Sequence, residues 1–188
     1  NPGAVNGYLQ VGCDLLAERV VDPSPADQPL VGICWQGNPA AERFVLRGRS
    51  MPLHAFAPLV AVAPVCLLSL QKLVGLDQLE DCVFRSSFVD WQDEFTPVLD
   101  FADVAIMMQR CDLIITVDTS VAHLAGAMGL PTWLLLHKVP DWRWGLDGDT
   151  TFWYPSMRLF RQREAGDWDE VMQRVAVAFQ DFVSTRSG

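Results

Sequence analysis

One stretch, residues 112–129 (DLIITVDTSVAHLAGAMG), constrains the fold of this chain more than any other. Its first part, 113–117, is a short and largely β-branched apolar run, typical of a strand buried on both faces. From Thr119 onward, small and apolar residues recur at helical spacing, and Gly129 followed by Pro131 predicts where that helix ends. A buried strand that runs into a helix places free backbone N–H groups at the carboxyl edge of a sheet, where such sheets bind phosphate-bearing ligands.

The same alternation of apolar strand and amphipathic helix runs through most of the chain. The expected strands are residues 30–35, 65–70, 113–117 and 132–136, with two weaker ones at 83–84 and 157–160. The expected helices are 52–60, 100–109, the one that begins near 119, and 168–183. This pattern predicts an α/β domain: a Rossmann-like parallel sheet with helices on both faces.

Two parts of unequal size are expected. Residues 1–29 are predicted to form an N-terminal segment with one short helix within 11–21 and a proline-containing linker, and residues 30–188 form the Rossmann-like domain. The chain begins at Asn1 rather than Met, so we expect it to be a piece of a longer protein.

Composition excludes several classes of function. Half of the 188 residues are apolar, which is enough for a sizeable core. The formal charge of −9 argues against nucleic acid and against an anionic membrane surface. We find no signal peptide and no membrane-length apolar run. The five cysteines are Cys13, Cys34, Cys66, Cys82 and Cys111. They are widely spaced and include no CxxC pair, so we expect no zinc site and a reducing, cytoplasmic compartment.

Common nucleotide and hydrolase signatures are absent. The chain has no GxGxxG, no GxxxxGK[ST] and no GxSxG, so a dinucleotide dehydrogenase, a P-loop enzyme and the common serine hydrolases are disfavoured. Four loops that follow expected strands remain as candidates, and all should meet at one edge of the sheet.

The first candidate loop follows residues 30–35. Gln36, Gly37 and Asn38 allow backbone N–H groups to approach a ligand closely, and Arg47 and Arg49 supply positive charge for a diphosphate. The alternative is a solvated basic loop.

The second loop offers Gln71 and Lys72 to a ribose or a base, although polar residues commonly follow a strand at a protein surface. The fourth, residues 137–155, is rich in tryptophan; such long loops often act as lids, but their aromatic residues can also simply pin the loop to the domain.

The third loop is the junction within the opening stretch. Asp118, Thr119 and Ser120 are good helix caps, and His123 lies one helical turn after Thr119 on the same face. Together they are candidates to hold a diphosphate; a capped helix beside a partly buried histidine is the structural alternative. A hydrolytic Asp118–His123 pair is less favoured, because no nucleophile accompanies it.

Several blocks in this order resemble a known family: GICWQGNP, RGRSMPL, SLQK, DFADVAIMMQRCDLIITVDTSVAHLAGAMGLPTWLLL, PDWRW and WYPSMRLFRQ. They are similar to the C-terminal half of bacterial glycosyltransferases that carry tetratricopeptide repeats and are related to the ADP-heptose heptosyltransferases. The resemblance implies one half of a glycosyltransferase-B fold that holds a nucleotide-sugar donor, with inverting chemistry that needs no metal and no cofactor beyond the nucleotide-diphosphate sugar as substrate.

By position, the resemblance assigns Asp118, Thr119, Ser120 and His123 to the donor's diphosphate and sugar. Arg49, and less directly Arg47, falls at a phosphate-binding position usually occupied by lysine. Gln71 falls near a ribose-binding acid. The family's general base belongs to the N-terminal half, so no catalytic residue is expected in this chain, and that half is an expected partner.

Three interpretations remain open from the sequence. The first is a donor-binding domain of a glycosyltransferase, the second a non-catalytic interaction module that keeps the fold, and the third, weaker one a nucleotide-sugar epimerase. The nucleotide, the sugar, the acceptor and the oligomeric state stay open.

Overall fold

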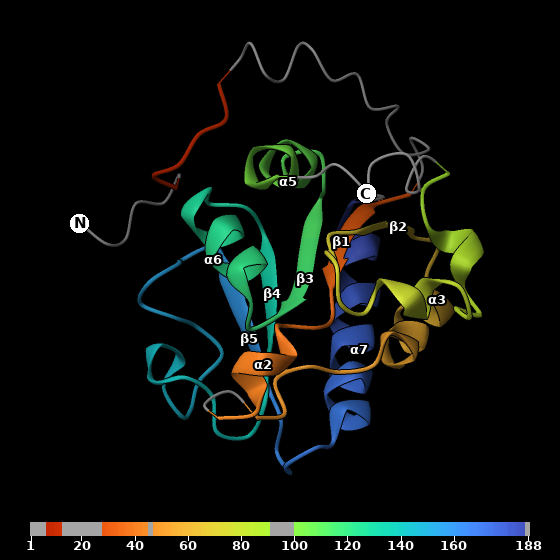
Figure 1. Cartoon of the computed structure of the whole chain (residues 1–188). Helices are drawn as coiled ribbons and strands as arrows, with labels where there is room; N and C mark the ends of the chain where they lie inside the picture. Colours follow the sequence, from red (N-terminus) through yellow and green to blue (C-terminus); the bar gives the residue numbers. More distant parts are fainter. Residues whose placement is uncertain (1–6, 13–27, 45–46, 91–99, 187–188) are drawn as a thin grey trace.

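A five-stranded parallel sheet forms the centre of the protein (Figure 1). The structure, a computed structural model, describes residues 7–12, 28–44, 47–90 and 100–186. The strands are β1 (Leu30–Cys34), β2 (Cys66–Ser69), β3 (Leu113–Val117), β4 (Thr132–Leu136) and β5 (Met157–Arg161), in the order β2-β1-β3-β4-β5. All four strand pairs are parallel, which confirms the predicted sheet.

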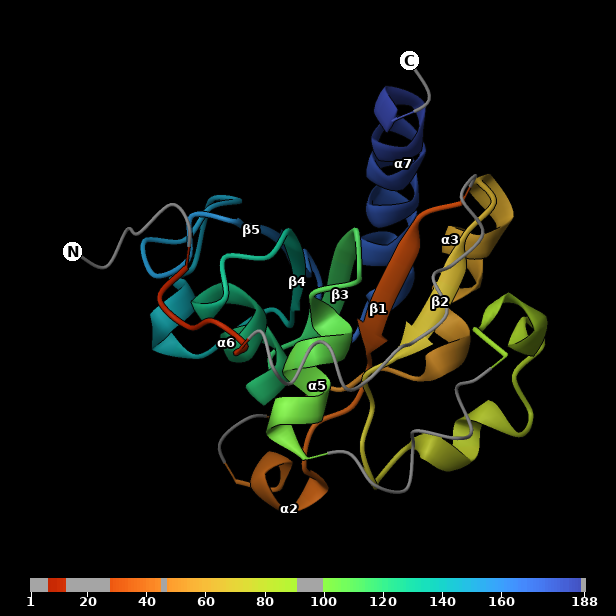
Figure 2. The ribbon, with the colours of Figure 1, turned by 90° about the horizontal axis from the view of Figure 1, so that it is seen from above.

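Helices cover both faces of the sheet, as predicted (Figure 2). On one face lie α3 (Ala57–Val62), which continues the 3-10 turn η1 (Leu53–Phe56), and the long α7 (Trp168–Arg186). On the other lie α5 (Phe101–Met108) and α6 (Ser120–Ala127). Successive side chains of a strand point to opposite faces, and both faces carry buried apolar side chains, so all five residues of β1, β3 and β4 are buried.

The order of the strands creates a crevice between β1 and β3. From β1 the chain passes α3 to reach β2 at the sheet edge, then returns along the opposite face through α5 to β3 on the other side of β1. Connections that leave two neighbouring strands for opposite faces open a gap at their carboxyl ends, where open α/β sheets bind ligands. The fold therefore marks the ends of β1 and β3 as the place for a site.

Three element predictions need correction. The strand expected at 83–84 is wrong, because those residues form a turn before η3 (Arg85–Ser87) and Phe84 reaches the core through its side chain. The residue that bridges to Leu67 of β2 is Phe88. The helix expected at 52–60 begins as the 3-10 turn η1 and ends at Val62. The last helix continues beyond 183 to Arg186, whose guanidinium contacts Asp112 Oδ1 at 2.8 Å.

The described part of the N-terminal segment packs on the domain. The backbone N–H groups of Tyr8 and Leu9 both donate to the carbonyl of Ala127, at 2.7 and 3.0 Å. A Cβ at Gly7, whose φ is +71°, would lie 2.3 Å from the backbone of Met128, so only glycine fits there. Most of the predicted helix at 11–21 and its linker lies outside the described residues.

A capping box fixes the start of α5, and it can be tested. Asp100 Oδ1 accepts from the N–H groups of Ala102 and Asp103, at 2.8 and 2.9 Å, and Asp103 Oδ2 accepts from the Asp100 N–H at 3.2 Å. We expect Asp100→Ala to lower the free energy of unfolding by about 1 kcal/mol in urea denaturation. Asp100→Asn keeps the accepting oxygen and should retain most of the stability; an equal loss in both variants would contradict this role.

Candidate functional site

A buried arginine joins the first and third candidate loops at the carboxyl ends of β1 and β3. Arg49 Nη1 donates to the backbone carbonyl of Asp118 at 2.9 Å, and Arg49 Nε contacts Glu42 Oε1 at 3.3 Å. Gly37 makes room for it, because a Cβ there would lie 2.5 Å from the guanidinium. The Gly37 N–H donates to Ser50 Oγ at 2.9 Å, so both sides of the loop that carries Arg49 are fixed.

Two other members of the first loop, Asn38 and Arg47, lie apart from Arg49 and make different contacts. Asn38 caps the short helix α2 (Pro39–Glu42), where its Oδ1 accepts from the Ala40 N–H at 2.9 Å. Arg47 is exposed and lines a separate cavity with His137 and Lys138. Arg49 and Arg47 therefore do not lie together at one binding position.

Gln71 holds the loop after β1 instead of presenting its amide to solvent. The side chain is buried, and its Oε1 accepts from the N–H groups of Trp35 and Gln36, at 3.1 and 3.0 Å. Its Nε2 donates to the carbonyls of Gln36 and Val74, at 2.9 and 2.8 Å. Both amide hydrogens of Gln71, which the sequence placed near a ribose, are thus engaged by backbone carbonyls; the neighbouring Lys72 is exposed.

This role of Gln71 predicts a large effect on stability. Gln71→Leu would leave the buried N–H groups of Trp35 and Gln36 without an acceptor, so we expect a loss of about 1–3 kcal/mol in the free energy of unfolding. Lys72→Ala, one residue on and exposed, should change it by less than about 0.5 kcal/mol. Similar unfolding curves for wild type and Gln71→Leu would contradict the assignment.

Thr119 begins α6, and the residues on either side of it are free for other contacts. Its Oγ1 accepts from the Val121 N–H at 3.3 Å and lies 3.3 Å from Thr116 Oγ1. Ser120 is exposed at the first position of the helix. Asp118 is only 3% exposed, yet its Oδ2 has no hydrogen-bond partner within the described residues. A buried carboxylate oxygen without a donor is costly, and a ligand hydroxyl would satisfy it.

His123 is held between aromatic side chains and faces Asp118. Its Nδ1 lies 3.0 Å from the Tyr154 hydroxyl, its Nε2 lies 3.9 Å from Asp118 Oδ1, and its ring stacks on Trp144 with centroids 5.2 Å apart. Burial lowers the pKa of His123, although the negative charge of Asp118 opposes the shift. The ring is therefore neutral at neutral pH, and Tyr154 and Trp144 orient it.

Sequence reasoning missed His137 as part of this site. It follows β4 and is buried, and its Nδ1 has no hydrogen-bond partner in the described part of the chain. Burial lowers its pKa, while the charges of Asp118 and Arg49 act on it in opposite directions. A histidine directly after a buried apolar strand was the signal available in the sequence.

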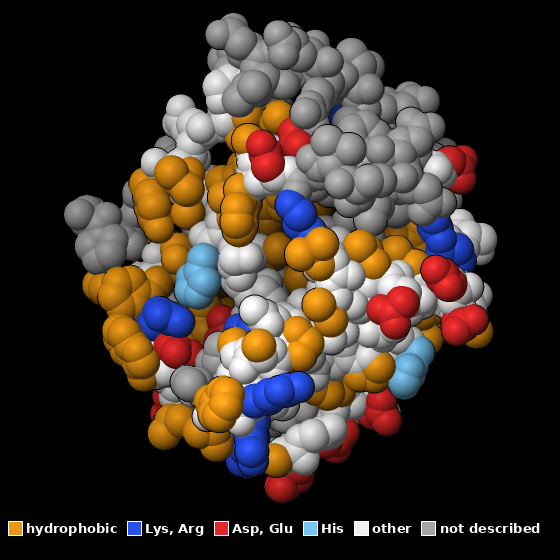
Figure 3. Space-filling model, viewed as in Figure 1, with side chains coloured by type: hydrophobic (Ala, Val, Ile, Leu, Met, Phe, Trp, Pro, Cys, Tyr) orange, Lys and Arg blue, Asp and Glu red, His pale blue; other side chains and the backbone are white. Residues whose placement is uncertain are grey.

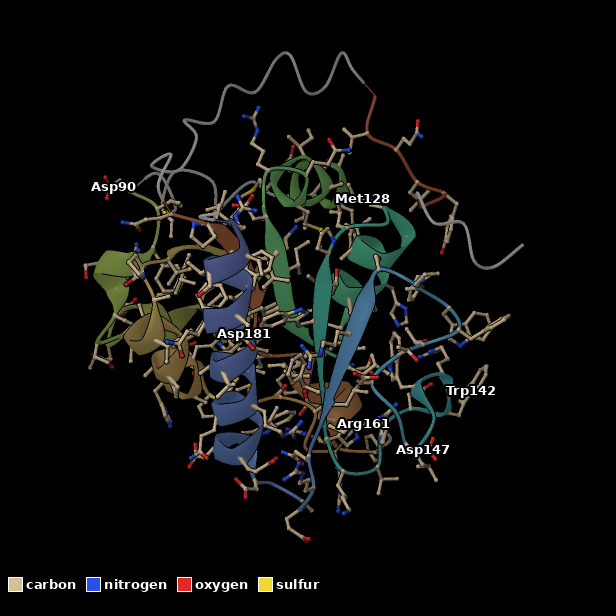
Figure 4. The ribbon with its side chains drawn as sticks, turned by 180° about the vertical axis from the view of Figure 1, so that it is seen from behind. Asp90, Met128, Trp142, Asp147, Arg161 and Asp181 are labelled. Atoms are coloured by element: carbon tan, nitrogen blue, oxygen red, sulfur yellow. The ribbon has the colours of Figure 1, made fainter. Side chains whose placement is uncertain are left out.

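Arg161 anchors the aromatic loop that follows β4. Its guanidinium donates to the carbonyls of Gly148 and Gly145, at 2.8 and 3.0 Å, and to that of Trp144, and Figure 4 shows it beside the loop that carries Asp147 and Trp142. Trp144 is buried under the loop, whereas hydrophobic side chains gather on the outer surface there; Trp142, Leu146 and Phe152 are exposed (Figure 3). Attachment of the loop to the domain thus explains the position of Trp144, but it does not explain the exposed aromatic residues.

The described residues show neither a metal-binding cluster nor a membrane-spanning helix. No group of three or more His, Cys, Asp and Glu side chains there is placed to hold a metal ion. No described helix is long and apolar enough to cross a membrane. The four cysteines in the described part are free thiols, while Cys13 lies outside it.

Known proteins resemble this chain in sequence. Residues 84–146 match the model of glycosyltransferase family 9 (heptosyltransferase). This range contains β3, α6 and β4 with Asp118, His123 and His137, while Arg49 and Gln71 lie before it. The chain is also 30% identical over 159 residues to Protein FlbA of Caulobacter vibrioides, a match that covers 84% of this chain and 26% of that protein.

One solved structure shares the fold, and a second is less similar. E. coli ADP-heptose lps heptosyltransferase II superposes with a TM-score of 0.60 at 16% identity, covering 96% of this chain and 54% of that one. E. coli heptosyltransferase WaaC with ADP-2-deoxy-2-fluoro heptose has a TM-score of 0.46 at 15% identity, covering 86% and 45%. The chain thus spans about a quarter of the curated relative and about half of the first solved structure, and its α/β fold resembles that of a domain of the latter.

The aromatic setting of His123 yields a spectroscopic prediction. Tyr154→Phe removes the hydroxyl that contacts Nδ1, so the ring should lose its single tautomer and the ¹⁵N shifts of Nδ1 and Nε2 should move toward each other. Phe152→Leu, an exposed change in the same loop, should leave both shifts in place. Unchanged nitrogen shifts in Tyr154→Phe would show that the hydroxyl does not fix the tautomer.

Proposed function

We propose that this chain is the nucleotide-sugar donor-binding domain of an inverting, metal-independent glycosyltransferase. The observation that carries the proposal is the junction of β3 and α6 at the β1/β3 crevice, where Arg49 bonds to the Asp118 backbone and His123 faces the Asp118 carboxylate. This junction lies in the range that matches the heptosyltransferase family model.

Each group at the junction has a role that follows from its chemistry. The first N–H groups of α6 and the Thr119 and Ser120 hydroxyls suit the oxygens of a diphosphate. Neutral His123 donates one ring hydrogen, and Arg49 contributes positive charge next to the same helix start. The unpartnered Oδ2 of Asp118 accepts a hydroxyl of the sugar.

The acceptor side of the reaction lies outside this chain in our proposal. The acidic base would belong to the facing N-terminal half of a longer, repeat-containing cytoplasmic protein, and the 188 residues alone would bind donor without transferring sugar. Such a domain needs no cofactor besides the nucleotide-diphosphate sugar itself.

A non-catalytic module with the same fold is the second candidate. It is favoured by one observation, the complete use of the Gln71 amide by backbone groups at a position where related enzymes carry a ribose-binding acid. Such a module would keep the junction at α6 but would show no affinity for nucleotide sugars.

Calorimetric titration separates the two candidates. We expect binding of at least one of UDP-, ADP- or GDP-sugars, and His123→Ala should weaken it by about 1–3 kcal/mol, the cost of removing one charge-assisted hydrogen bond. His54→Ala, which changes an exposed histidine on η1, should leave binding intact. A folded chain that binds none of these donors at millimolar concentration supports the non-catalytic module instead.

A further inference from the structure

A cavity of about 370 Å³ lies beside the proposed donor site, next to the carboxyl ends of β4 and β5. Its polar lining residues are Arg47, His137, Lys138 and Gln162, and Phe44 and Val139 are the large apolar ones. Its walls come from three segments: the first candidate loop, the start of the fourth, and residues 162–166 after β5, which the sequence did not indicate.

The charge of the cavity is opposite to that of the protein. The chain carries 23 acidic and 14 basic residues, yet none of the residues that line this cavity is acidic, whereas Arg47 and Lys138 are both cationic. A local concentration of donors without carboxylates favours an anionic ligand even in a protein whose net charge is negative. The side chains of both cations are exposed, and the Lys138 ammonium, which donates to the Arg163 carbonyl, has two further hydrogens to offer.

Two buried nitrogens in the cavity wall lack partners. Gln162 Nε2 and His137 Nδ1 make no hydrogen bond within the described residues, although the side chains are only 4% and 7% exposed. The orientation of the Gln162 amide is fixed, since its Oε1 accepts from the N–H groups of Lys138 and Gly166, at 3.3 and 3.0 Å. Its Nε2 is therefore a donor in need of an acceptor.

The size and the apolar walls indicate an organic ligand. A volume of about 370 Å³ is in the range of small-molecule sites and is much larger than a bare ion needs. Phe44 and Val139, which are 85% and 70% exposed, offer apolar surface of the kind that covers the C–H faces of a sugar ring.

We propose that this cavity binds the carboxylate of an acidic sugar, with Gln162 Nε2, Arg47 and Lys138 as its donors. His137 lines the cavity, and Asp118 and Arg49 lie near enough for their charges to act on its pKa. The selection of a carboxylate by the cavity is independent of the proposed function. The assignment of the acidic sugar to the donor rests on that function.

The first experiment tests the cavity alone. The full chain, labelled at histidine ring and glutamine amide nitrogens, is titrated by NMR with D-glucuronate and with D-glucose, which differ only at the C6 carboxylate. Glucuronate should shift the His137 and Gln162 signals to saturation and glucose should not. Absence of these shifts up to about 100 mM glucuronate, a range that still detects very weak binding, would overturn the proposal.

Three variants sharpen this test. Gln162→Glu keeps an oxygen for the Lys138 and Gly166 N–H groups but replaces the donor with an anion, and the double variant Arg47→Gln, Lys138→Gln removes both exposed cations. Each should weaken glucuronate binding about tenfold or more, as expected for lost charge-assisted bonds. Arg158→Gln, which removes an exposed charge at a different cavity, should have no effect. Equal affinity in all of these proteins would overturn the assignment.

A second experiment assigns the acidic sugar to the donor or to another molecule. Affinities for UDP-glucuronate and UDP-glucose are compared in wild type and in the double variant. If UDP-glucuronate binds more tightly by a ratio that the double variant abolishes, the carboxylate belongs to the donor. If free glucuronate binds and neither nucleotide sugar binds more tightly than it, the carboxylate site in the cavity is supported. The proposed donor site at the junction of β3 and α6 is then contradicted for uridine-diphosphate sugars.

Discussion

The contact between the Arg49 guanidinium and the Asp118 carbonyl is the interaction on which the site depends. It connects the loop after β1 to the end of β3 across the crevice that the strand order creates. A buried arginine is stable only when its N–H groups find acceptors, and Glu42 and the Asp118 carbonyl supply them. The close approach in turn requires glycine at position 37.

Around this contact the polar groups divide into those that hold the structure and those that remain available. Gln71, Asn38 and Ser50 are engaged by backbone groups or by their neighbours. Six buried side-chain polar atoms have no partner in the described chain: Asp118 Oδ2, His137 Nδ1 and Gln162 Nε2, which follow β3, β4 and β5, and three atoms of Trp35, Trp144 and Ser156. Unpartnered buried atoms destabilise a domain unless something binds them, so the three that follow neighbouring strands are a structural sign of ligand binding.

The sequence predicted the elements well where local pattern and burial agree. The strands at 113–117 and 132–136 match β3 and β4 in full, because runs that are apolar on both faces fit only the centre of a parallel sheet. It failed at 83–84, where one large apolar residue reaches the core from a turn. It did not reveal that the side chains of Gln71 and Asn38 bond to the backbone, since a polar residue after a strand looks the same whether it binds a ligand or the backbone.

By itself the sequence determined the parallel α/β fold and the strand-to-helix junction at Asp118–His123, because periodicity and capping residues act over a few neighbouring positions. Only the tertiary structure decided which polar groups remain free. It separated Arg47 from Arg49, used up the amide of Gln71, and brought His137 and Gln162 from the ends of two strands to one cavity. The physical reason is that hydrogen-bond satisfaction depends on partners distant in the chain, and no local pattern records them.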